Sequence, residues 1–435
     1  MLGMSLGLHL TRQGHRVTVF ERAPSIGGLA SPARIGEFTW DRFYHVTLLS
    51  DTSLRALLEE IGLAERLRWA ITRTGVYGAG KLHSVSTSFE FLTFPLLSLL
   101  DKVRLGATIL YASRIRDGRA LEAIPVTEWL QRWSGRRTWE RLWLPLLRSK
   151  LGENYRLASA SFIWAIIARM YGARRSGQKR EMFGYVQGGY DTVLRRLHEH
   201  LVNTGVTIRL GSGVEEVRSG AGVALVRTSD GITHEFDDIV LTLPCSRIAR
   251  VCPQLTDEER DRLGRVVYQG VLCASVLLRR PLGGFYVTNI TDDGFPFTAV
   301  FEMTALVDPA TFGGNTLVYL PRYLAQEESY WNRSDRDIRE DFLQGLERMY
   351  PDLRREDVLA FEVSRVREVL AISTLNYSAE VMPPVETSAE HLYIVNSAQI
   401  ANGTLNVNET LALAERQAGV LHPLLQRRPA MAGAS

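Results

Sequence analysis

Two glycines and one acidic residue near the start of the sequence have the spacing of a nucleotide-binding site. Gly3 stands four residues before Gly7 and eighteen residues before Glu21. In a dinucleotide-binding motif, a late glycine lets a helix start close to a pyrophosphate, and an acid about twenty residues on binds ribose hydroxyls. The spacing predicts that Gly3 is the last glycine of G-x-G-x-x-G and that Gly7 lets the helix pack on a strand. The motif's first strand and first two glycines are missing, so we expect the chain to start inside it.

The residues around these glycines predict the elements that would position them. Residues 4–13 continue a helix, and the apolar run 17–20 is typical of a buried parallel strand that Glu21 closes. A glycine-containing loop follows. Apolar residues at helical spacing then indicate a helix over 54–61, which Gly62 ends.

The rest of the chain divides by pattern into helical and strand-rich parts. Residues 88–182 are mostly helical in pattern and hold five tryptophans, which we expect to be core residues. Several strand-like apolar runs in 265–385 predict a sheet-rich part with one helix near 335–349. The pattern also predicts a helix that Gly188 and Gly189 open and a last helix over 409–421. Short apolar runs at 206–210, 239–241 and 392–395 predict further strands.

Five segments, in this order, carry a family resemblance. They are V-T-V-F-E-R, I-G-G-L-A-S, F-T-W-D-R-F-Y-H, V-Q-G-G-Y and V-T-I-R-L-x3-V-x2-V. The series resembles the FAD-dependent amine oxidase superfamily, and within it the proteins similar to protoporphyrinogen oxidase and the phytoene-type desaturases. The resemblance covers nearly the whole chain and is strongest at 3–63 and 183–245. It is specific to a fold and not to a substrate.

The resemblance implies a fold and a cofactor. The fold is α/β, with a Rossmann-like FAD-binding domain of the glutathione-reductase type, its first strand missing, and a mixed α+β substrate domain. FAD is the implied cofactor. The implied order is FAD-binding at 1–75, a helical substrate part at 76–184, FAD-binding at 185–264, a sheet-rich substrate part at 265–385, FAD-binding at 386–425 and a tail at 426–435.

The same resemblance implies roles for residues of the FAD site. Glu21 matches the acid that holds the adenosine ribose, and Val214 matches the residue whose backbone meets the adenine edge. Gly27 and Gly28 match a second glycine pair, whose backbone passes close to the pyrophosphate. Many relatives carry Arg after that pair, whereas this chain has Leu29, so any phosphate charge there must be met otherwise.

Further cofactor residues are implied near the carboxyl end. Relatives usually have a Gly-Asp pair before the last helix, where this chain has Asn396 and Ser397, which can hydrogen-bond but bring no charge. Gly403 and the turn through Asn408 should set the last helix with its amino terminus at the flavin pyrimidine edge, where it would stabilise negative charge on reduced flavin. The cofactor-binding residues that we expect are Gly3, Gly7, Glu21, Arg22, Gly27, Gly28, Leu29, Val214, Ser397 and Gly403.

The candidates for catalysis are His45 and Lys150. The resemblance places residues 41–45 under the flavin ring, where His45 could transfer a proton or position substrate, although a lone histidine beside aromatic residues is more often a packing residue. Lys150 lies where sugar-mutase relatives carry a Lys-x-Gly turn, and a surface lysine is an equally good reading. Glu302 and Thr304 are candidates on a substrate-domain strand, and an ordinary strand pair explains them equally well. The sequence has no Ser/His/Asp nucleophile motif, P-loop or metal-ligand spacing, so flavin would carry the redox chemistry.

Composition limits the class of protein. At 435 residues, with 45% apolar and 23% charged residues, the chain is expected to fold as two domains with a cleft between them. Its three cysteines have no disulfide or metal-ligand spacing, which favours a reducing cytoplasm. The apolar start lacks the features of a signal peptide, and we expect no membrane-spanning helix.

The charge of the chain is unevenly distributed. The net charge is +3, yet residues 100–180 hold 17 Lys and Arg against 6 Asp and Glu, a local balance of +11 that leaves −8 elsewhere. Such a block could make a peripheral contact with anionic lipid or bind a phosphorylated ligand, and a solvated helical surface explains it equally well. We expect a small-molecule substrate and no nucleic-acid partner, and the oligomeric state is left open.

Three functions stay open at this point. The leading one is an FAD-dependent oxidoreductase that passes hydride from a lipophilic or conjugated small molecule to flavin N5. The second is a redox-neutral flavin enzyme resembling the UDP-galactopyranose mutases, in which arginines such as Arg174 and Arg175 grip a nucleotide-sugar pyrophosphate. The third is a non-catalytic or mis-started product, because losing a central strand should cost more than the roughly 5 to 15 kcal/mol by which domains are stable.

Overall fold

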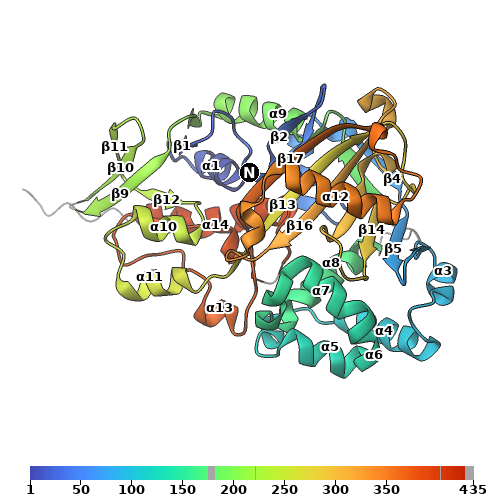
Figure 1. Cartoon of the computed structure of the whole chain (residues 1–435). Coiled ribbons are helices and arrows are strands. Elements are labelled where there is room, and N and C mark those ends of the chain that lie inside the picture. Colours follow the sequence, from blue (N-terminus) through green and yellow to red (C-terminus); the bar gives the residue numbers. More distant parts are fainter. Residues whose placement is uncertain (175–181, 221, 402, 427–435) are drawn as a thin grey trace, which may run out of the picture.

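Two pairs of parallel strands are assembled from segments far apart in the sequence. The computed structural model describes residues 1–174, 182–220, 222–401 and 403–426 (Figure 1). The pairs are β1 (Thr18–Phe20) beside β8 (Thr207–Arg209) and β12 (Ile239–Leu241) beside β18 (Leu392–Ile394). Among the described residues no strand joins the two pairs into one sheet. The predicted strands at 17–20, 206–210, 239–241 and 392–395 are therefore all present.

Four helices pack around these strands: α1 (Leu2–Arg12), α2 (Thr52–Glu60), α9 (Gly189–Thr204) and α14 (Val407–Leu425). Helix α1 is buried on two sides. Its Met4 and Leu8 join the core shared with α2 and α9, and its Leu6 and Leu10 join the core shared with α14. The predicted helices are confirmed, although α14 is longer than the 409–421 that the sequence pattern indicated.

A small antiparallel sheet and two helices flank the strand pairs. The sheet has the order β11-β10-β9, from β9 (Val214–Gly220), β10 (Val223–Thr228) and β11 (Thr233–Phe236). The helices are α10 (Cys245–Val251) and α11 (Asp257–Gly264). The turn between β10 and β11 uses Gly231 at φ +80°, where a residue with a side chain would be strained.

A seven-stranded mixed sheet forms the second layer of the molecule. Its order is β17-β13-β16-β15-β14-β5-β6. Strand β13 is buried at every position, with β16 and β17 antiparallel on its two sides, and α12 covers one face of the sheet. The bounds are β5 (Thr74–Gly78), β6 (Lys81–Ser84), β13 (Tyr268–Leu278), β14 (Val287–Ile290), β15 (Ala299–Glu302), β16 (Thr316–Leu324), β17 (Val358–Ala371) and α12 (Asp335–Met349).

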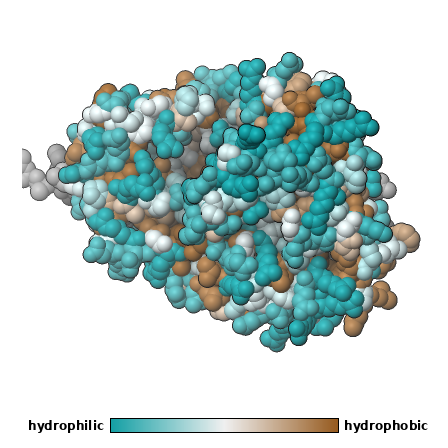
Figure 2. Space-filling model, in the orientation of Figure 1, coloured by the Kyte–Doolittle hydropathy of each residue, from teal (hydrophilic) through white to brown (hydrophobic). Residues whose placement is uncertain are grey.

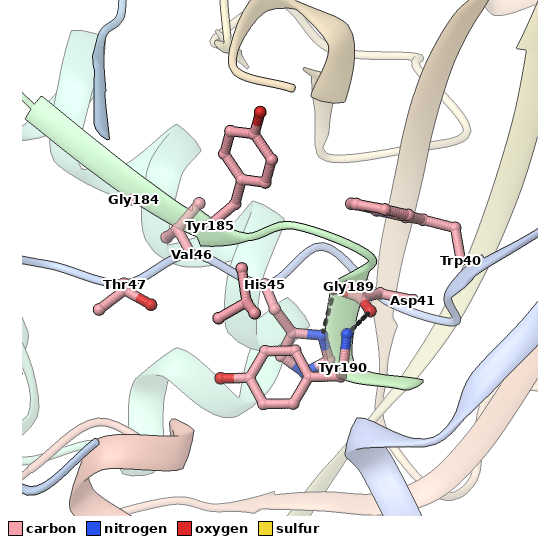
Figure 3. A pocket seen from close by; sticks show the side chains of 10 residues that line it. Trp40, Asp41, His45, Val46, Thr47, Gly184, Tyr185, Gly189 and Tyr190 are labelled. Atoms are coloured by element: carbon pink, nitrogen blue, oxygen red, sulfur yellow. Dashed lines mark hydrogen bonds and ion pairs between the residues drawn. The ribbon is translucent and has the colours of Figure 1, made fainter. Parts of the chain in front are cut away.

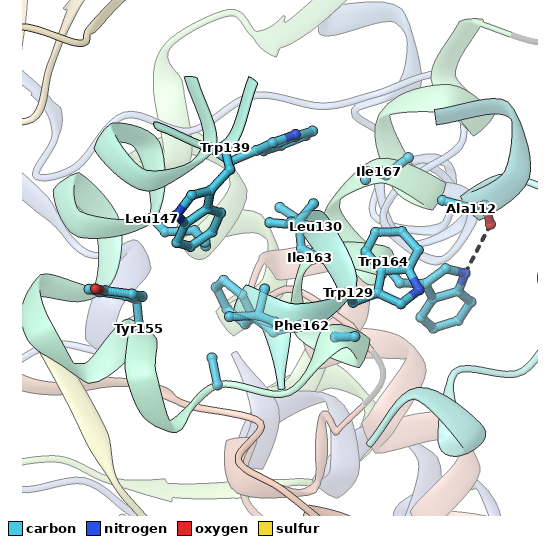
Figure 4. Packing of buried hydrophobic residues seen from close by; sticks show 14 of the residues in the cluster. Ala112, Trp129, Leu130, Trp139, Leu147, Tyr155, Phe162, Ile163, Trp164 and Ile167 are labelled. Atoms are coloured by element: carbon cyan, nitrogen blue, oxygen red, sulfur yellow. Dashed lines mark hydrogen bonds between the residues drawn. The ribbon is translucent and has the colours of Figure 1, made fainter. Parts of the chain in front are cut away.

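A helical region lies below the large sheet in the view of Figure 1. It consists of α3 (Ser88–Thr93), α4 (Leu99–Ala112), α5 (Val126–Ser134), α6 (Arg136–Thr138), a π-helical turn (Trp139–Trp143), α7 (Leu144–Leu151) and α8 (Ala160–Arg174). Tryptophan side chains form much of its core (Figure 4). Trp129, Trp139, Trp143 and Trp164 are buried as predicted, whereas the prediction is wrong for Trp133, which is exposed.

Two further two-stranded antiparallel sheets are present, and only the first of them is a hairpin. They are β2 (Pro32–Ile35) with β3 (Phe38–Asp41), and β4 (Leu67–Ile71) with β7 (Met182–Val186). Trp40 and Phe43 pack in one core with Cys273 of the large sheet, which fixes the loop after β3 against that sheet. A short helix, α13 (Tyr377–Glu380), precedes β18. In the part of the chain that the structure covers, no helix has the length and apolar character needed to cross a membrane.

Candidate functional site

The end of β1 and the start of β9 lie together. The backbone N–H of Glu21 donates to the Arg209 carbonyl at 2.9 Å, and its carbonyl accepts from Ser212 N–H at 2.9 Å. A Cβ added to Gly213 would lie 3.2 Å from Cγ of Arg22, so Arg22 lies over the residue that precedes Val214. The fold therefore brings Glu21, Arg22 and Val214 to one place, although Val214 is almost 200 residues away in sequence.

The glycines expected at the pyrophosphate have different surroundings. A Cβ on Gly27 would lie 2.6 Å from Cδ1 of Leu194 on α9, so this glycine is required by packing within the protein. Gly28 has φ +58° and no atom within 4 Å of an added Cβ, which leaves open space for another group to approach its backbone. Leu29 packs with the apolar core below the loop, which accounts for an aliphatic residue here.

Gly3 and Gly7 both face strands. A Cβ on Gly3 would lie 3.3 Å from Oγ1 of Thr242, directly after β12. A Cβ on Gly7 would lie 3.4 Å from Cγ1 of Val17 and 3.5 Å from Cγ2 of Val19. Gly7 thus allows α1 to lie close to β1, as the sequence spacing indicated, and Gly3 lies at the end of the second strand pair.

Asn396 and Ser397 differ in their burial and in their hydrogen bonds. Asn396 is buried, its amide donates to the Leu243 carbonyl at 2.9 Å, and its Oδ1 accepts from Ala398 N–H at 3.0 Å. These bonds tie the end of β18 to the end of β12. Ser397 begins the short turn 397–399 and is only half-buried.

Replacing Asn396 by alanine should therefore lower the free energy of unfolding by about 2 kcal/mol, because the Leu243 carbonyl and the Ala398 amide lose their partner in a buried place. Urea unfolding measures the change. Ser397→Ala is the control and should stay within about 0.5 kcal/mol of the parent. Equal losses for the two variants would show that the Asn396 bonds carry no special stability.

A cavity of about 250 Å³ lies between α8, the turn after Ser50 and the start of α14. Its walls combine apolar and polar side chains, namely Ser50, Asp51, Trp164, Ala165, Ala168, Arg169, Gly403, Thr404, Asn408 and Glu409. Gly403 thus borders this cavity and lies just before α14, a helix of 19 residues. Asn406 caps the amino terminus of α14, because its side-chain oxygen accepts a hydrogen bond from Glu409 N–H at 3.0 Å. The positive end of that helix favours negative charge nearby.

Arg169 and Asp51 form an ion pair in this cavity, in which the Asp51 side chain is buried and the Arg169 side chain is partly buried. Arg169 Nη2 donates to both carboxylate oxygens of Asp51 at 3.2 Å, and Arg169 Nη1 donates to Thr404 Oγ1 at 3.2 Å. Burial raises the pKa of Asp51, and the Arg169 guanidinium opposes that rise. Sequence reasoning missed both residues. The available signal was that Arg169 is the one charged residue in the run 158–172.

His45 lies in a small pocket between the loop after β3 and the start of α9 (Figure 3). Its ring centroid is 4.6 Å from that of Tyr190, and its Nδ1 is 3.7 Å from Asp41 Oδ2, too far for a hydrogen bond. Asp41 in turn accepts from Tyr190 N–H at 2.7 Å, within the first turn of α9. His45 thus contacts a carboxylate that holds a helix terminus, a setting that suits the packing role.

Lys150 lies apart from His45 but is linked to the same loop. Its Nζ lies 5.4 Å from the centroid of the Tyr323 ring, and the hydroxyls of Tyr323 and Tyr44 are 2.7 Å apart. Tyr44 also stacks on Phe301 at 3.7 Å. Burial raises the pKa of Tyr44 well above its ordinary value, so this phenol stays protonated at neutral pH. The sequence did not single out Tyr44 or Tyr323.

The remaining candidates have structural surroundings or lie outside the described residues. Glu302 is buried and accepts from the N–H groups of residues 282–284 at 2.9 to 3.2 Å, so it holds a turn. Thr304 Oγ1 is buried and has no hydrogen-bond partner among the described residues. Arg174 ends α8, and Arg175 lies outside the described residues. No group of three or more metal-ligating side chains occurs within residues 1–174, 182–220, 222–401 and 403–426.

Comparison with known proteins gives a family and a fold. The model of the family described as flavin containing amine oxidoreductase matches residues 3–392. Comparison with curated proteins found no match. Among solved structures, a protein assigned as a protoporphyrinogen oxidase from Exiguobacterium sp. 255-15 is 18% identical, with a TM-score of 0.75 and coverage of 97% of this chain and 96% of that one.

Two further solved structures are similar in fold. An oxidoreductase from Methanosarcina mazei is 20% identical with a TM-score of 0.74, over 96% of this chain and 98% of that one. Cyclohexylamine oxidase from Brevibacterium oxydans IH-35A is 15% identical with a TM-score of 0.69, over 98% of this chain and 97% of that one. At these identities the likeness shows a shared fold and does not specify a substrate.

Proposed function

Because this chain belongs to the flavin-containing amine oxidoreductase family and is therefore an FAD-dependent oxidoreductase, we propose that it oxidises a lipophilic or conjugated small molecule. FAD, when bound, supplies the redox chemistry by accepting a hydride at flavin N5. The protein's residues would bind the cofactor, orient the substrate and exclude water.

The residues present fit such a cofactor. Glu21 and Val214 lie together at the end of β1 and the start of β9, where an adenosine would be held. Gly28 leaves open space above its backbone, and Gly403 borders a cavity at the start of α14. We propose that the positive end of α14 stabilises negative charge on the reduced cofactor.

The observation that carries the substrate proposal is the composition of the 250 Å³ cavity. Trp164, Ala165 and Ala168 of α8 form the apolar part of the lining, which also includes the turn at Gly403 and Thr404. An apolar wall favours a substrate that gains from leaving water. His45 and Lys150 stay proposals for roles near the reacting atoms, supported by the pocket at His45 and the contact of Lys150 with Tyr323.

The test is anaerobic reduction of the purified flavoprotein by candidate substrates. We expect a reduced tetrapyrrole or a polyene to bleach the oxidised-flavin absorbance, and a small hydrophilic amine to do so at least about tenfold more slowly. Absence of flavin from the purified protein would contradict the cofactor role. Bleaching by the hydrophilic amine alone would contradict the substrate class.

Replacing Glu21 by glutamine should raise the dissociation constant for FAD by roughly tenfold or more, because charge-assisted hydrogen bonds to ribose hydroxyls become neutral ones. Quenching of flavin fluorescence on titration measures the constant. Glu37→Gln, at an exposed position in the turn between β2 and β3, is the matched control and should leave it unchanged. An unchanged constant in the Glu21 variant would remove this residue from the cofactor site.

We also propose that the protein works in a reducing compartment such as the cytoplasm, with a peripheral contact to an anionic surface through the basic segment 100–180. Support for the first comes from Cys245, Cys252 and Cys273, which are all buried free thiols. Support for the second comes from the local balance of +11 in that segment.

A further inference from the structure

Helix α4 buries Leu105 and Ala112, but several of its other apolar side chains lie outside and several of its polar side chains lie inside. Leu99, Leu100 and Val103 are 67%, 67% and 62% exposed, whereas Asp101 and Lys102 are each only 7% exposed. A helix on the surface of a globular protein normally shows the opposite pattern. This arrangement leaves the helix with an outward apolar face that nothing within the described part of the chain covers.

The inward polar residues are held by specific bonds that fix the rotation of the helix. Asp101 forms a capping box with Ser98, and Lys102 Nζ donates to the Leu92 carbonyl at 2.6 Å. Further along, Thr108 is fully buried and accepts from Ser134 Oγ at 3.1 Å. Turning α4 to bury its leucines would break these bonds in a buried place, so the outward apolar face is built into the fold.

Helix α3 continues this apolar face. Phe89 and Leu92 are 75% and 54% exposed. Figure 2 shows hydrophobic side chains gathered at the lower right edge of the molecule, where Figure 1 places α3. Single exposed apolar residues are ordinary, but a contiguous group marks a contact with another molecule or with lipid. The α3–α4 face comprises Phe89, Leu92, Leu99, Leu100 and Val103.

The chain segment that contains and follows α4 is rich in basic residues. Residues 99–141 hold nine Lys and Arg against five Asp and Glu. Arg104 is exposed on α4, and Arg114 and Arg116 are exposed directly after it. Tyr111 stacks on Trp133 at 4.0 Å near the end of α4, with both rings partly exposed. Helices that lie in a membrane interface combine an apolar face, aromatic rings and basic residues in this way.

We propose that α3 and α4 dock on an anionic lipid bilayer. The apolar side chains of the α3–α4 face enter the boundary between headgroups and acyl chains, and the arginines around it contact lipid phosphates. A lipid surface fits better than a protein partner because α3 and α4 lie at the edge of the molecule (Figure 1), where Figure 2 shows apolar side chains on the surface, and because residues 99–141 carry an excess of basic over acidic residues. The inference does not depend on the reaction, although a bilayer would also hold a lipophilic substrate.

The test is flotation of the full chain with lipid vesicles. We expect binding to vesicles of phosphatidylcholine with phosphatidylglycerol, and much weaker binding to phosphatidylcholine alone. The variant Leu99→Gln/Leu100→Gln/Val103→Gln should bind about tenfold or more weakly, because three apolar side chains no longer gain from leaving water. The matched control Val202→Gln/Ile232→Gln/Leu359→Gln removes three exposed apolar side chains elsewhere and should bind as the parent does.

Two further measurements separate lipid from other partners. Arg114→Gln/Arg116→Gln should weaken binding to the anionic vesicles several-fold, and brominated lipid should quench tryptophan fluorescence through Trp133. Failure of the parent to bind anionic vesicles, or unchanged binding by the triple variant, would overturn the proposal. So would a dimer that the triple variant dissociates in gel filtration while vesicles stay unbound. Flavin content and its reduction, measured on the same samples, should be unchanged in every variant, which keeps this test independent of the proposed reaction.

Discussion

Replacing Arg169 by alanine is expected to lower the free energy of unfolding by about 3 kcal/mol, among the largest effects of any single polar substitution in this protein. The Asp51 side chain is only 3% exposed, and Arg169 supplies its charge partner through two hydrogen bonds of 3.2 Å. Without Arg169, the carboxylate keeps, among the described residues, one hydrogen bond, which Leu48 N–H donates at 2.8 Å. A buried charge would then be left without compensation.

The loss should depend on pH in a defined direction. Burial already raises the pKa of Asp51 above that of an unfolded chain, and removing Arg169 raises it further. Between the two values the folded variant binds a proton that the unfolded chain does not, so its stability falls as pH rises through the raised pKa. Urea unfolding at about pH 4.5 and about pH 8 should therefore show the larger deficit, relative to the parent, at the higher pH.

An exposed ion pair provides the control for Arg169. Arg195 pairs with Asp191 on the surface of α9, and the two side chains are 66% and 38% exposed. Arg195→Ala should change stability by less than about 0.5 kcal/mol at either pH. If Arg169→Ala behaves like Arg195→Ala, the pair in the cavity contributes no more than a surface salt bridge.

The second large effect is expected at Gly27. Gly27→Ala should lower the free energy of unfolding by about 3 kcal/mol, because φ is +125° and the new Cβ would meet Cδ1 of Leu194 at 2.6 Å and backbone atoms of Ser31 at 3.1 Å. Leu194 is buried and Ser31 contributes its main chain, so neither can move freely. The turn that carries Gly28 would shift, so affinity for FAD should fall as well.

A variant at Gly14 serves as the control that distinguishes backbone strain from a steric clash of the added Cβ. It has φ +93° and no atom within 4 Å of an added Cβ, so Gly14→Ala introduces strain alone and should cost about 1 kcal/mol. Thermal unfolding and flavin titration of the two variants give the comparison. Should Gly27→Ala cost no more than Gly14→Ala and bind FAD normally, the packing of this turn against α9 would not position the cofactor.

Local sequence patterns predicted those helices and strands well whose formation depends on the residues of a single segment. The run from Asp335 to Met349 has helical spacing, and α12 has those bounds. The short apolar runs became the parallel strands, because a strand buried on both faces needs apolar residues throughout. The family, the FAD cofactor and the class of enzyme also followed from the order of the motifs, and the family comparison confirms them.

Features that depend on distant segments could not be predicted. Arg169 and Asp51 are 118 residues apart, and no local pattern announces that they pair. Trp133 lies in an aromatic-rich helical region and was expected in the core, but it lies on the outward side beside Tyr111. Helix periodicity identifies two faces of a segment, whereas the neighbouring elements decide which face is buried. The individual roles of His45, Lys150 and the cofactor residues stay predictions.

The pairing of strands has a consequence for how the polypeptide matures. The strand Thr18–Phe20 can pair only after the chain near residue 208 has been synthesised. The strand Ile239–Leu241 can pair only after the chain near residue 393 has been synthesised. Such long loop closures are slow, so the second strand pair is completed only when the last part of the chain has left the ribosome. Nascent chains halted before residue 392 should therefore keep apolar strand faces open and depend on chaperones.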